Sequence, residues 1–213
     1  VAAKSTTPQP TLPGTIFTVA DEARKLGVRA LPVKVDIRND AEVDNMVDAT
    51  VKEFGRVDFL ICNSGALWWK NVDATPMSKY DLVQGVNARG TFACVAACLP
   101  HMRRQNFGRV VVMSPPVDSR LLKGHVAYCI SKFGMTMIAE GVAKETEGTG
   151  ISANALWPAT LIESFATRNF QMGETDNWRK ADIIADATVM ILQDDSKDVR
   201  GKALIDEEYL YSR

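Results

Sequence analysis

The stretch from Val57 to Ala66, VDFLICNSGA, decides the fold of this chain. Its first six residues form a short, mostly apolar run that is typical of a buried strand, and Asn63, Ser64 and Gly65 follow at once. In open parallel sheets, ligands bind beside the carboxyl ends of the strands. Small residues there let a planar or phosphorylated ligand approach the backbone. The stretch therefore predicts a buried strand that ends in a ligand site.

Helical and strand-like patterns alternate on both sides of this stretch, which is the signature of βαβ units. We expect an α/β fold: a doubly wound, Rossmann-like, mostly parallel sheet with helices on both faces, in one domain over residues 1–213. The predicted strands cover residues 31–37, 57–62, 109–113, 151–156 and 202–206, and the predicted helices cover residues 15–27, 39–55, 75–104, 127–147 and 181–192.

Composition excludes several classes of function. The 213 residues are 46% hydrophobic and 24% charged with a net charge of −1, so no electrostatic attraction to nucleic acid or anionic membrane is expected. No apolar stretch long enough for a membrane span and no secretory signal stand out. The four cysteines, Cys62, Cys94, Cys98 and Cys129, lie in apolar surroundings as reduced core thiols do. We expect a soluble intracellular protein, with cytosol, mitochondrion and peroxisome all open.

Tyr128 and Lys132 are four residues apart on a predicted helix, hence on one face. An ammonium near a phenol favours the phenolate and lowers its pKa from about 10, as a general acid or base working near neutral pH requires. The same spacing also occurs in solvated helix pairs. The pair by itself leaves both interpretations open.

Five motifs in order resemble the short-chain dehydrogenase/reductase family. They are residues 63–65 (NSG), 87–91 (NARGT), Ser114, residues 128–132 (YCISK) and residues 154–158 (NALWP). Together with residues 12–16 (LPGTI) and 182–187 (DIIADA), they look like the hydroxysteroid dehydrogenase-like protein 2 branch of that family. The resemblance covers essentially the whole chain.

The resemblance implies a nicotinamide-dependent carbonyl reductase or alcohol dehydrogenase for a small-to-medium apolar, even lipid-like, substrate. Tyr128 would exchange the proton with the substrate oxygen, and Lys132 would lower the pKa of Tyr128 and hold the nicotinamide ribose. Ser114 would hydrogen-bond the substrate oxygen. Asn87 would anchor a water in a proton relay to Lys132.

The resemblance also implies a cofactor site at the strand ends. Asp36 would lie beside the adenine and Asn63 along the ribose, with Ser64 and Gly65 in the same turn. Pro158 and Thr160 would complete the site together with Tyr128 and Lys132. Lys4 stands where NAD-preferring relatives carry Asp, which offers a cation to a 2′-phosphate and favours NADP over NAD.

The chain departs from the family pattern in three places. The opening strand, glycine-rich phosphate turn and helix of the family are missing before Val1, so we expect that roughly 35–40 residues of the natural protein precede it. Ser114 lies one residue further from Tyr128 than the usual family spacing, which puts Pro115 at the expected position. Asp206, Glu207 and Glu208 stand where relatives often have Asp-Gly-Gly.

Other residues invite weaker interpretations. Cys94, Cys98 and His101 share a helix face, but no fourth ligand is apparent, and we expect no metal site. His125 precedes Tyr128 by three residues and is interpreted as a loop histidine. Trp68 and Trp69 follow the Asn-Ser-Gly turn and either cover a pocket or simply pack.

The resemblance further implies a homodimer or homotetramer through the long helices around residues 76–104 and 127–147. The expected partners are thus a second copy and a small carbonyl or alcohol. The alternative is a non-catalytic member of the fold that binds a nucleotide or a partner protein without turnover. The missing glycine turn motivates this alternative, whereas Asn87, Tyr128 and Lys132 argue against it.

Overall fold

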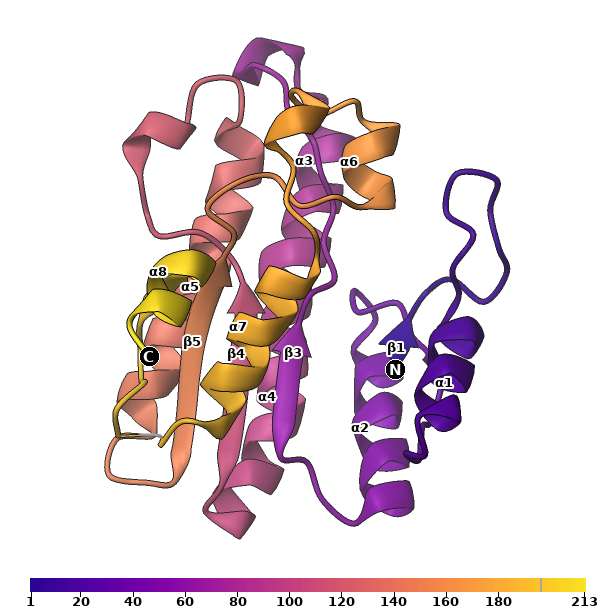
Figure 1. The fold of residues 1–213 in the computed structure, drawn as a ribbon, viewed down its shortest axis with the longest axis vertical. Helices are drawn as coiled ribbons and strands as arrows, with labels where there is room; N and C mark the ends of the chain where they lie inside the picture. The colour runs from indigo at the N-terminus through magenta and orange to yellow at the C-terminus, as the bar shows by residue number, and fades with distance from the viewer. Residues whose placement is uncertain (196) are drawn as a thin grey trace.

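The computed structural model describes residues 1–195 and 197–213. Its strands are β1 (Ala2–Ala3), β2 (Val33–Lys34), β3 (Phe59–Cys62), β4 (Gly108–Met113), β5 (Ile151–Trp157) and β6 (Ala203–Ile205). Its α-helices are α1 (Ile16–Lys25), α2 (Asp40–Phe54), α3 (Met77–Gln84), α4 (Gly90–Gln105), α5 (Val126–Glu145), α6 (Phe165–Asn169), α7 (Asp182–Gln193) and α8 (Asp206–Tyr211). A π-helical turn, Gly85–Arg89, joins α3 to α4 (Figure 1).

The strands pair in parallel throughout, as the alternation of helices and strands predicts. β3, β4, β5 and β6 form one sheet in that order, and β1 pairs with β2 in a separate sheet. Parallel pairing places the carboxyl ends of β3, β4 and β5 at the same edge. The loops that begin at Asn63, Ser114 and Pro158 therefore leave the sheet together.

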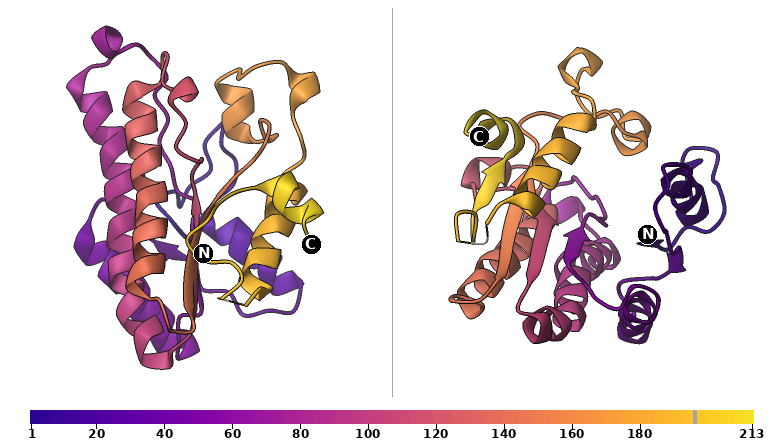
Figure 2. Two further views of the ribbon diagram at one scale, coloured as in Figure 1. Left: turned by 90° about the vertical axis from the view of Figure 1, so that its left-hand side faces the viewer. Right: turned by 60° about the horizontal axis from the view of Figure 1, so that its bottom comes forward.

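Helices cover both faces of the four-stranded sheet (Figure 2). Alternate side chains of β4 point to opposite faces: Val110 and Val112 join a buried cluster with residues of α2, α4 and α5, while Val111 joins a cluster with α7 and α8. β4 and β5 are buried along nearly their whole length, as expected of a central parallel strand covered on both sides. The predicted doubly wound α/β fold is confirmed.

Local sequence explains where the helices begin and end. Thr15 caps α1 in a reciprocal capping box with Thr18, and the Asn39 side chain accepts hydrogen bonds from the first backbone N–H groups of α2. Gly55 ends α2 with a φ of 84°, which suits glycine. The short helices α6 and α8 were not predicted. They carry one turn or so each and lack a long apolar stripe.

The gap between the two sheets lies between β1 and β3. A cavity of about 140 Å³ separates them, lined by Ala2 of β1, by Leu60 and Ile61 of β3, and by residues of α2 and α4. Ile61 is 38% exposed and Phe59 is 48% exposed, although both belong to a strand of the central sheet. The predicted sheet is therefore divided, because nothing in the described chain pairs with β1 and β3 at the same time.

One helical run, Met77–Gln105, is long and apolar enough to cross a membrane by length and composition alone. No stretch of this length and composition was expected from the sequence. Pro100 lies within this run, and the buried side chains Cys94, Cys98 and Met102 pack into the core beside β4. These contacts are typical of a core helix of an α/β fold.

Candidate active site

Asn87 is the completely buried centre of the site. It lies in the π-helical turn, a distortion frequent at functional positions. Its Oδ1 accepts a hydrogen bond from Ala66 N (2.7 Å), and its Nδ2 donates to Ala66 O (3.0 Å) and to Ser131 Oγ (2.9 Å). The Asn87 side chain thus ties the turn after β3 to α5, the helix that carries Tyr128.

Lys132 is held against the ends of β4 and β5. Its Nζ donates to the carbonyl oxygen of Met113 (2.7 Å), and it lies 5.4 Å from the ring centre of Trp157 and 5.8 Å from that of Tyr128. The side chain is 6% exposed, and burial lowers the pKa of Lys132 to about 8. The ammonium can therefore lose its proton not far above neutral pH.

Gly65 brings the turn after β3 close to Asn87 and Lys132. A Cβ added at Gly65 would lie 3.5 Å from Asn87 Oδ1 and 3.8 Å from Lys132 Nζ. The structure thus brings Gly65, Asn87 and Lys132 together at one edge of the sheet. Tyr128 is one helical turn from Lys132 on α5, and its ring lies beside the Lys132 ammonium.

Tyr128 lies in an aromatic setting. Trp69 approaches the Tyr128 ring edge-on, with centroids 6.1 Å apart, and contacts His125 in the same way at 4.9 Å. Burial raises the pKa of Tyr128 above its ordinary value, with a smaller contribution from Cys129. The pKa of Tyr128 is therefore not lowered as expected from Lys132, because burial of the phenol dominates. Tyr128 therefore keeps its proton at neutral pH.

Ser114 is placed differently from the other predicted catalytic residues. It is fully buried, and its Oγ accepts a hydrogen bond from Thr136 Oγ1 (2.9 Å) of α5. Thr136 also donates to the carbonyl oxygen of Pro115 (2.6 Å). The Ser114 hydroxyl thus fastens the loop after β4 to α5. Sequence spacing did not reveal the role of Thr136 in this contact.

A pocket of about 320 Å³ joins the ends of β1, β2 and β3. Four predicted cofactor residues line it: Lys4, Asp36, Ser64 and Gly65. Arg38, which was not predicted from the sequence, lines it too. Asp36 accepts two hydrogen bonds from the Arg38 guanidinium, and Lys4 Nζ lies 3.4 Å from Asp36 Oδ2. Hydrogen bonding to Arg38, with a smaller part from Lys4, holds the pKa of Asp36 well below its usual range.

The remaining predicted cofactor residues lie in loops at the same edge of the sheet. Asn63 is exposed directly after β3, and Pro158 follows β5. Thr160 is also exposed, and its Oγ1 accepts a hydrogen bond from Arg179 Nε (2.8 Å). None of these three lines the pocket beside Asp36. Arg179, which fixes this loop, was not predicted from the sequence because it belongs to none of the quoted motifs.

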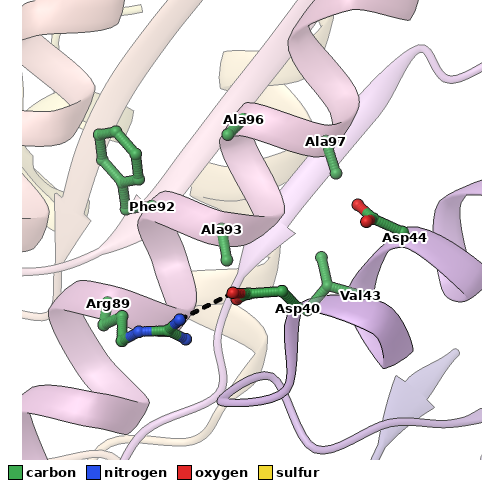
Figure 3. Close-up of a pocket in the computed structure, with 8 residues that line it drawn as sticks. All are labelled: Asp40, Val43, Asp44, Arg89, Phe92, Ala93, Ala96 and Ala97. Atoms are coloured by element: carbon green, nitrogen blue, oxygen red, sulfur yellow. Dashed lines mark hydrogen bonds and ion pairs between the residues drawn. The ribbon is translucent and has the colours of Figure 1, made fainter.

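A second groove, of about 440 Å³, lies between α2 and α4 and shares no lining residue with the site (Figure 3). Arg89 crosses it to form an ion pair with Asp40 at 2.8 Å, and Phe92 lies at its border, pointing away from Asp44.

All four cysteines are buried and free, as predicted for core thiols.

Comparisons with known proteins identify the class to which this fold and site belong. The family model for short chain dehydrogenase matches residues 13–173. The hydroxysteroid dehydrogenase-like protein 2 of Xenopus tropicalis is 39% identical over 99% of this chain and 51% of its own length. The chain thus spans about half the length of the curated relatives it matches.

Solved structures agree with this match. A short chain dehydrogenase from Mycobacterium thermoresistibile superimposes with a TM-score of 0.92 at 35% identity, over 99% of this chain and 76% of the other. An NAD⁺-bound xylitol dehydrogenase, 22% identical, has a TM-score of 0.81 over 89% of this chain and 83% of the other, and so shares the fold. The chain belongs to the short-chain dehydrogenase family. Within that family it falls in the hydroxysteroid dehydrogenase-like protein 2 branch.

Proposed function

We propose that this chain carries the reaction centre of an NADP-dependent oxidoreductase that reduces a carbonyl, or oxidises a secondary alcohol, on a small-to-medium apolar substrate. The observation that carries the proposal is the convergence of Gly65, Asn87, Tyr128 and Lys132 at the edge of the sheet next to the pocket beside Asp36. The aromatic rings of Trp69 and Trp157 around Tyr128 and Lys132 support an apolar substrate.

The residues at the pocket suit a dinucleotide. The pocket has a volume of about 320 Å³ and is lined by small and apolar residues such as Ser64, Gly65 and Leu82, which would admit a planar base, and Asp36 can accept hydrogen bonds. Lys4 and Arg38 together carry two positive charges against the single negative charge of Asp36. The surplus charge favours a 2′-phosphate and hence NADP. Lys132 would hold the nicotinamide ribose, with Pro158 and Thr160 in the loop after β5.

The reaction divides between cofactor and protein. The bound nicotinamide supplies or accepts the hydride. In the reductive direction, neutral Tyr128 donates its hydroxyl proton to the substrate oxygen, so that a C–H and an O–H bond form and a phenolate remains. Lys132 Nζ lies 5.8 Å from the centre of that ring, so its protonated form would offset part of the cost of leaving a buried phenolate while the proton is replaced. Asn87 holds the turn after β3 against α5, the helix that carries Tyr128 and Lys132.

The unpaired edges of β1 and β3 support a second part of the proposal. A parallel strand placed between them would pair with both edges. Phe59 and Ile61, which are exposed for residues of a central strand, project on one face of β3, where the helix that follows such a strand would cover them. We infer that the complete protein supplies this strand together with a phosphate-binding turn. Such a turn would end beside Ser64 and Gly65, next to the pocket at Asp36.

The exposed faces of α4 and α5 support a homodimer or homotetramer. Phe92 of α4 is 63% exposed, and Ile130 and Met137 of α5 are 46% and 67% exposed. Large apolar side chains gathered on two neighbouring helices are typical of a buried contact between subunits. The proposal therefore includes association of two copies through these helices.

Carbonyl-dependent oxidation of NADPH tests the function. Purified protein is assayed with cyclohexanone, acetophenone and 2-decanone, beside a Tyr128→Phe variant that keeps the ring and removes the transferable proton. We expect turnover by the wild type and a loss on the order of 10³-fold or more in the variant. Tight NADPH binding with no turnover on any ketone would favour the non-catalytic alternative. Equal rates in both proteins would refute the role of Tyr128.

A further inference from the structure

A hydrogen bond joins two loops that lie far apart in the chain. Asn169, the last residue of α6, donates from its Nδ2 to the backbone carbonyl oxygen of Thr11 at 2.8 Å, across 158 positions of sequence. Thr11 belongs to the loop between β1 and α1, whereas α6 belongs to the segment that follows β5. Neither residue is part of a sequence motif, so only the fold reveals that they meet.

The order of the strands shows what this bond spans. β1 and β3 lie on either side of the gap between the two sheets, and β4 and β5 follow β3. With one strand placed in that gap, β1 and β5 would be roughly 19 Å apart, at about 4.8 Å per strand. Figure 1 shows α6 beyond the carboxyl ends of the strands, between β3 and the loop after β1. The bond therefore passes over the edge of the sheet at which the site residues lie.

One side of the bond is a loop with a defined shape. Residues 5–14, named here the first arm, are closed at their base by the Ile16 N–H, which donates to the Ser5 carbonyl oxygen at 3.4 Å. Near the tip, Gln9 and Leu12 exchange two backbone hydrogen bonds of 3.0 Å. The carbonyl group that accepts the bond from α6 lies inside this turn.

The other side of the bond is held at its base as well. Residues 161–179, named here the second arm, are closed by backbone hydrogen bonds from Glu163 N to Arg179 O (2.8 Å) and from Arg179 N to Leu161 O (3.0 Å). The ion pair between Arg179 and the buried Asp206 ties that base to the start of α8. The bond thus joins two segments that are each fixed where they leave the fold.

The proposed cofactor site lies between the bases of the two arms. Lys4, which lines the pocket beside Asp36, directly precedes the first arm. Thr160, in the loop proposed to adjoin the nicotinamide ribose, directly precedes the second arm. A dinucleotide laid along the carboxyl ends of the strands, from one base to the other, would lie beneath the bond.

We propose that Asn169 is a positioning residue whose bond to Thr11 closes the two arms into a clasp over the dinucleotide. The inference rests on the proposed function. Loops that close over a bound ligand commonly set the rate of its release, and one exposed hydrogen bond is weak enough to open repeatedly. Because the bond joins protein atoms alone, the clasp gates entry and release equally and leaves the Kd nearly unchanged.

Stopped-flow fluorescence of NADPH binding gives the first test. Asn169→Leu keeps a similar side-chain volume and removes the donor. Asn177→Leu is the matched control, because Asn177 is an exposed residue of the second arm whose side chain has no hydrogen bond among the described residues. We expect Asn169→Leu to raise the association and dissociation rate constants together, about three- to tenfold, with Kd and Tm unchanged. Asn177→Leu should change neither rate.

Three results of this test overturn the proposal. They are unchanged rates in Asn169→Leu, an equal rise in Asn177→Leu, and a rise in the dissociation rate alone. In the last case Asn169 would support only the bound state and would not gate the site.

A second test locks the arms together. Thr11→Cys and Asn169→Cys are combined, and oxidised glutathione joins the two new thiols in a disulfide while it is itself reduced to two molecules of glutathione. The four native cysteines are buried and should not take part. The locked protein should bind and release NADPH at least about tenfold more slowly than the same protein after dithiothreitol. Equal rates before and after reduction overturn the proposal, as does a pair of thiols that cannot be joined.

Failure of the proposed function gives a different result. A wild type that binds neither NADPH nor NADH would refute the cofactor site and the clasp with it. A wild type that binds NADPH with rates that respond neither to Asn169→Leu nor to locking would refute the clasp alone.

Discussion

Arg179 and Asp206 form an ion pair in which the carboxylate is completely buried. Arg179 Nη2 lies 2.9 and 2.8 Å from the two carboxylate oxygens, and Asp206 also accepts hydrogen bonds from the backbone N–H groups of Ala159 and Glu207. Arg179 in turn donates to Thr160 Oγ1. The pair therefore fastens the loop after β5, where cofactor residues are proposed, to the start of α8.

Arg179→Met should strongly destabilise the protein. It leaves the Asp206 charge buried without its cation, and breaking a buried pair in this way costs about 3–5 kcal/mol. Urea unfolding measures the difference in the free energy of unfolding. The matched control is Arg168→Met, which breaks an exposed ion pair with Glu163 and should cost less than about 1 kcal/mol. Similar losses in both variants would contradict the special role of Asp206.

The burial of Lys132 predicts how stability depends on pH. Its pKa is about 8 in the fold against an ordinary value of 10.5, so between these values the folded chain has released a proton that the unfolded chain still binds. Stability therefore rises with pH across this window, by about 3 kcal/mol in total for this group. The wild type should gain this amount relative to Lys132→Met between pH 7 and 10.5 in urea titrations. A constant difference between the two proteins would refute the lowered pKa.

The sequence predicts the fold well because its signals are local. Each of these signals determines the conformation of the residues next to it. They are the turns at Asn63 and Ser114 that end strands, the helix cap at Asn39 and the glycine after α2, and the structure has each at the predicted position. The short strand β2 is less complete than predicted. Only two residues pair there, because only the two-residue β1 lies beside it.

The site was harder to predict where it depends on contacts between distant residues. Spacing along a helix put Tyr128 and Lys132 on one face, but it could not show that burial would raise the pKa of Tyr128 instead of lowering it. Likewise, the motif at Ser114 does not reveal that Thr136, 22 residues away, donates a hydrogen bond to the Ser114 oxygen. Arg38 reaches the pocket beside Asp36, where a cofactor is proposed, only through the turn after β2.

Two glycines should respond in opposite ways to alanine substitution. A Cβ at Gly150 would lie 2.1 Å from the carbonyl oxygen of Asn106, so Gly150→Ala must move backbone and should lose more than about 2 kcal/mol of stability. Gly141 lies inside α5 with nothing within 4 Å of its added Cβ in the single chain, and Gly141→Ala should gain about 1 kcal/mol from helix propensity. Because Gly141 shares a face with Met137, this gain is measured in the Phe92→Glu background, in which the proposed subunit contact is broken. Thermal and urea unfolding measure both. A neutral Gly150→Ala would contradict the close approach of the two loops.

Association through α4 and α5 predicts that a charge on their exposed face separates the subunits. Phe92→Glu should shift the molar mass measured by light scattering toward that of one chain, because burying an unpaired carboxylate in an apolar contact is unfavourable. Phe170→Glu is the control, since Phe170 is 62% exposed but lies next to α6, away from these helices. Unchanged mass in the Phe92 variant would exclude this face as the contact.

The cation pair at the cofactor pocket predicts which dinucleotide binds. Lys4 and Arg38 both approach Asp36, and their surplus positive charge should favour the 2′-phosphate. Calorimetric titration should therefore find that NADPH binds at least tenfold more tightly than NADH, a difference in binding free energy of about 1.4 kcal/mol or more. Lys4→Gln should remove about a factor of ten from NADPH affinity and leave NADH nearly unchanged. Lys34→Gln, on the neighbouring strand and outside the pocket, should change neither. Equal affinities in the wild type would refute the NADP preference, and binding of neither dinucleotide would refute the cofactor site itself.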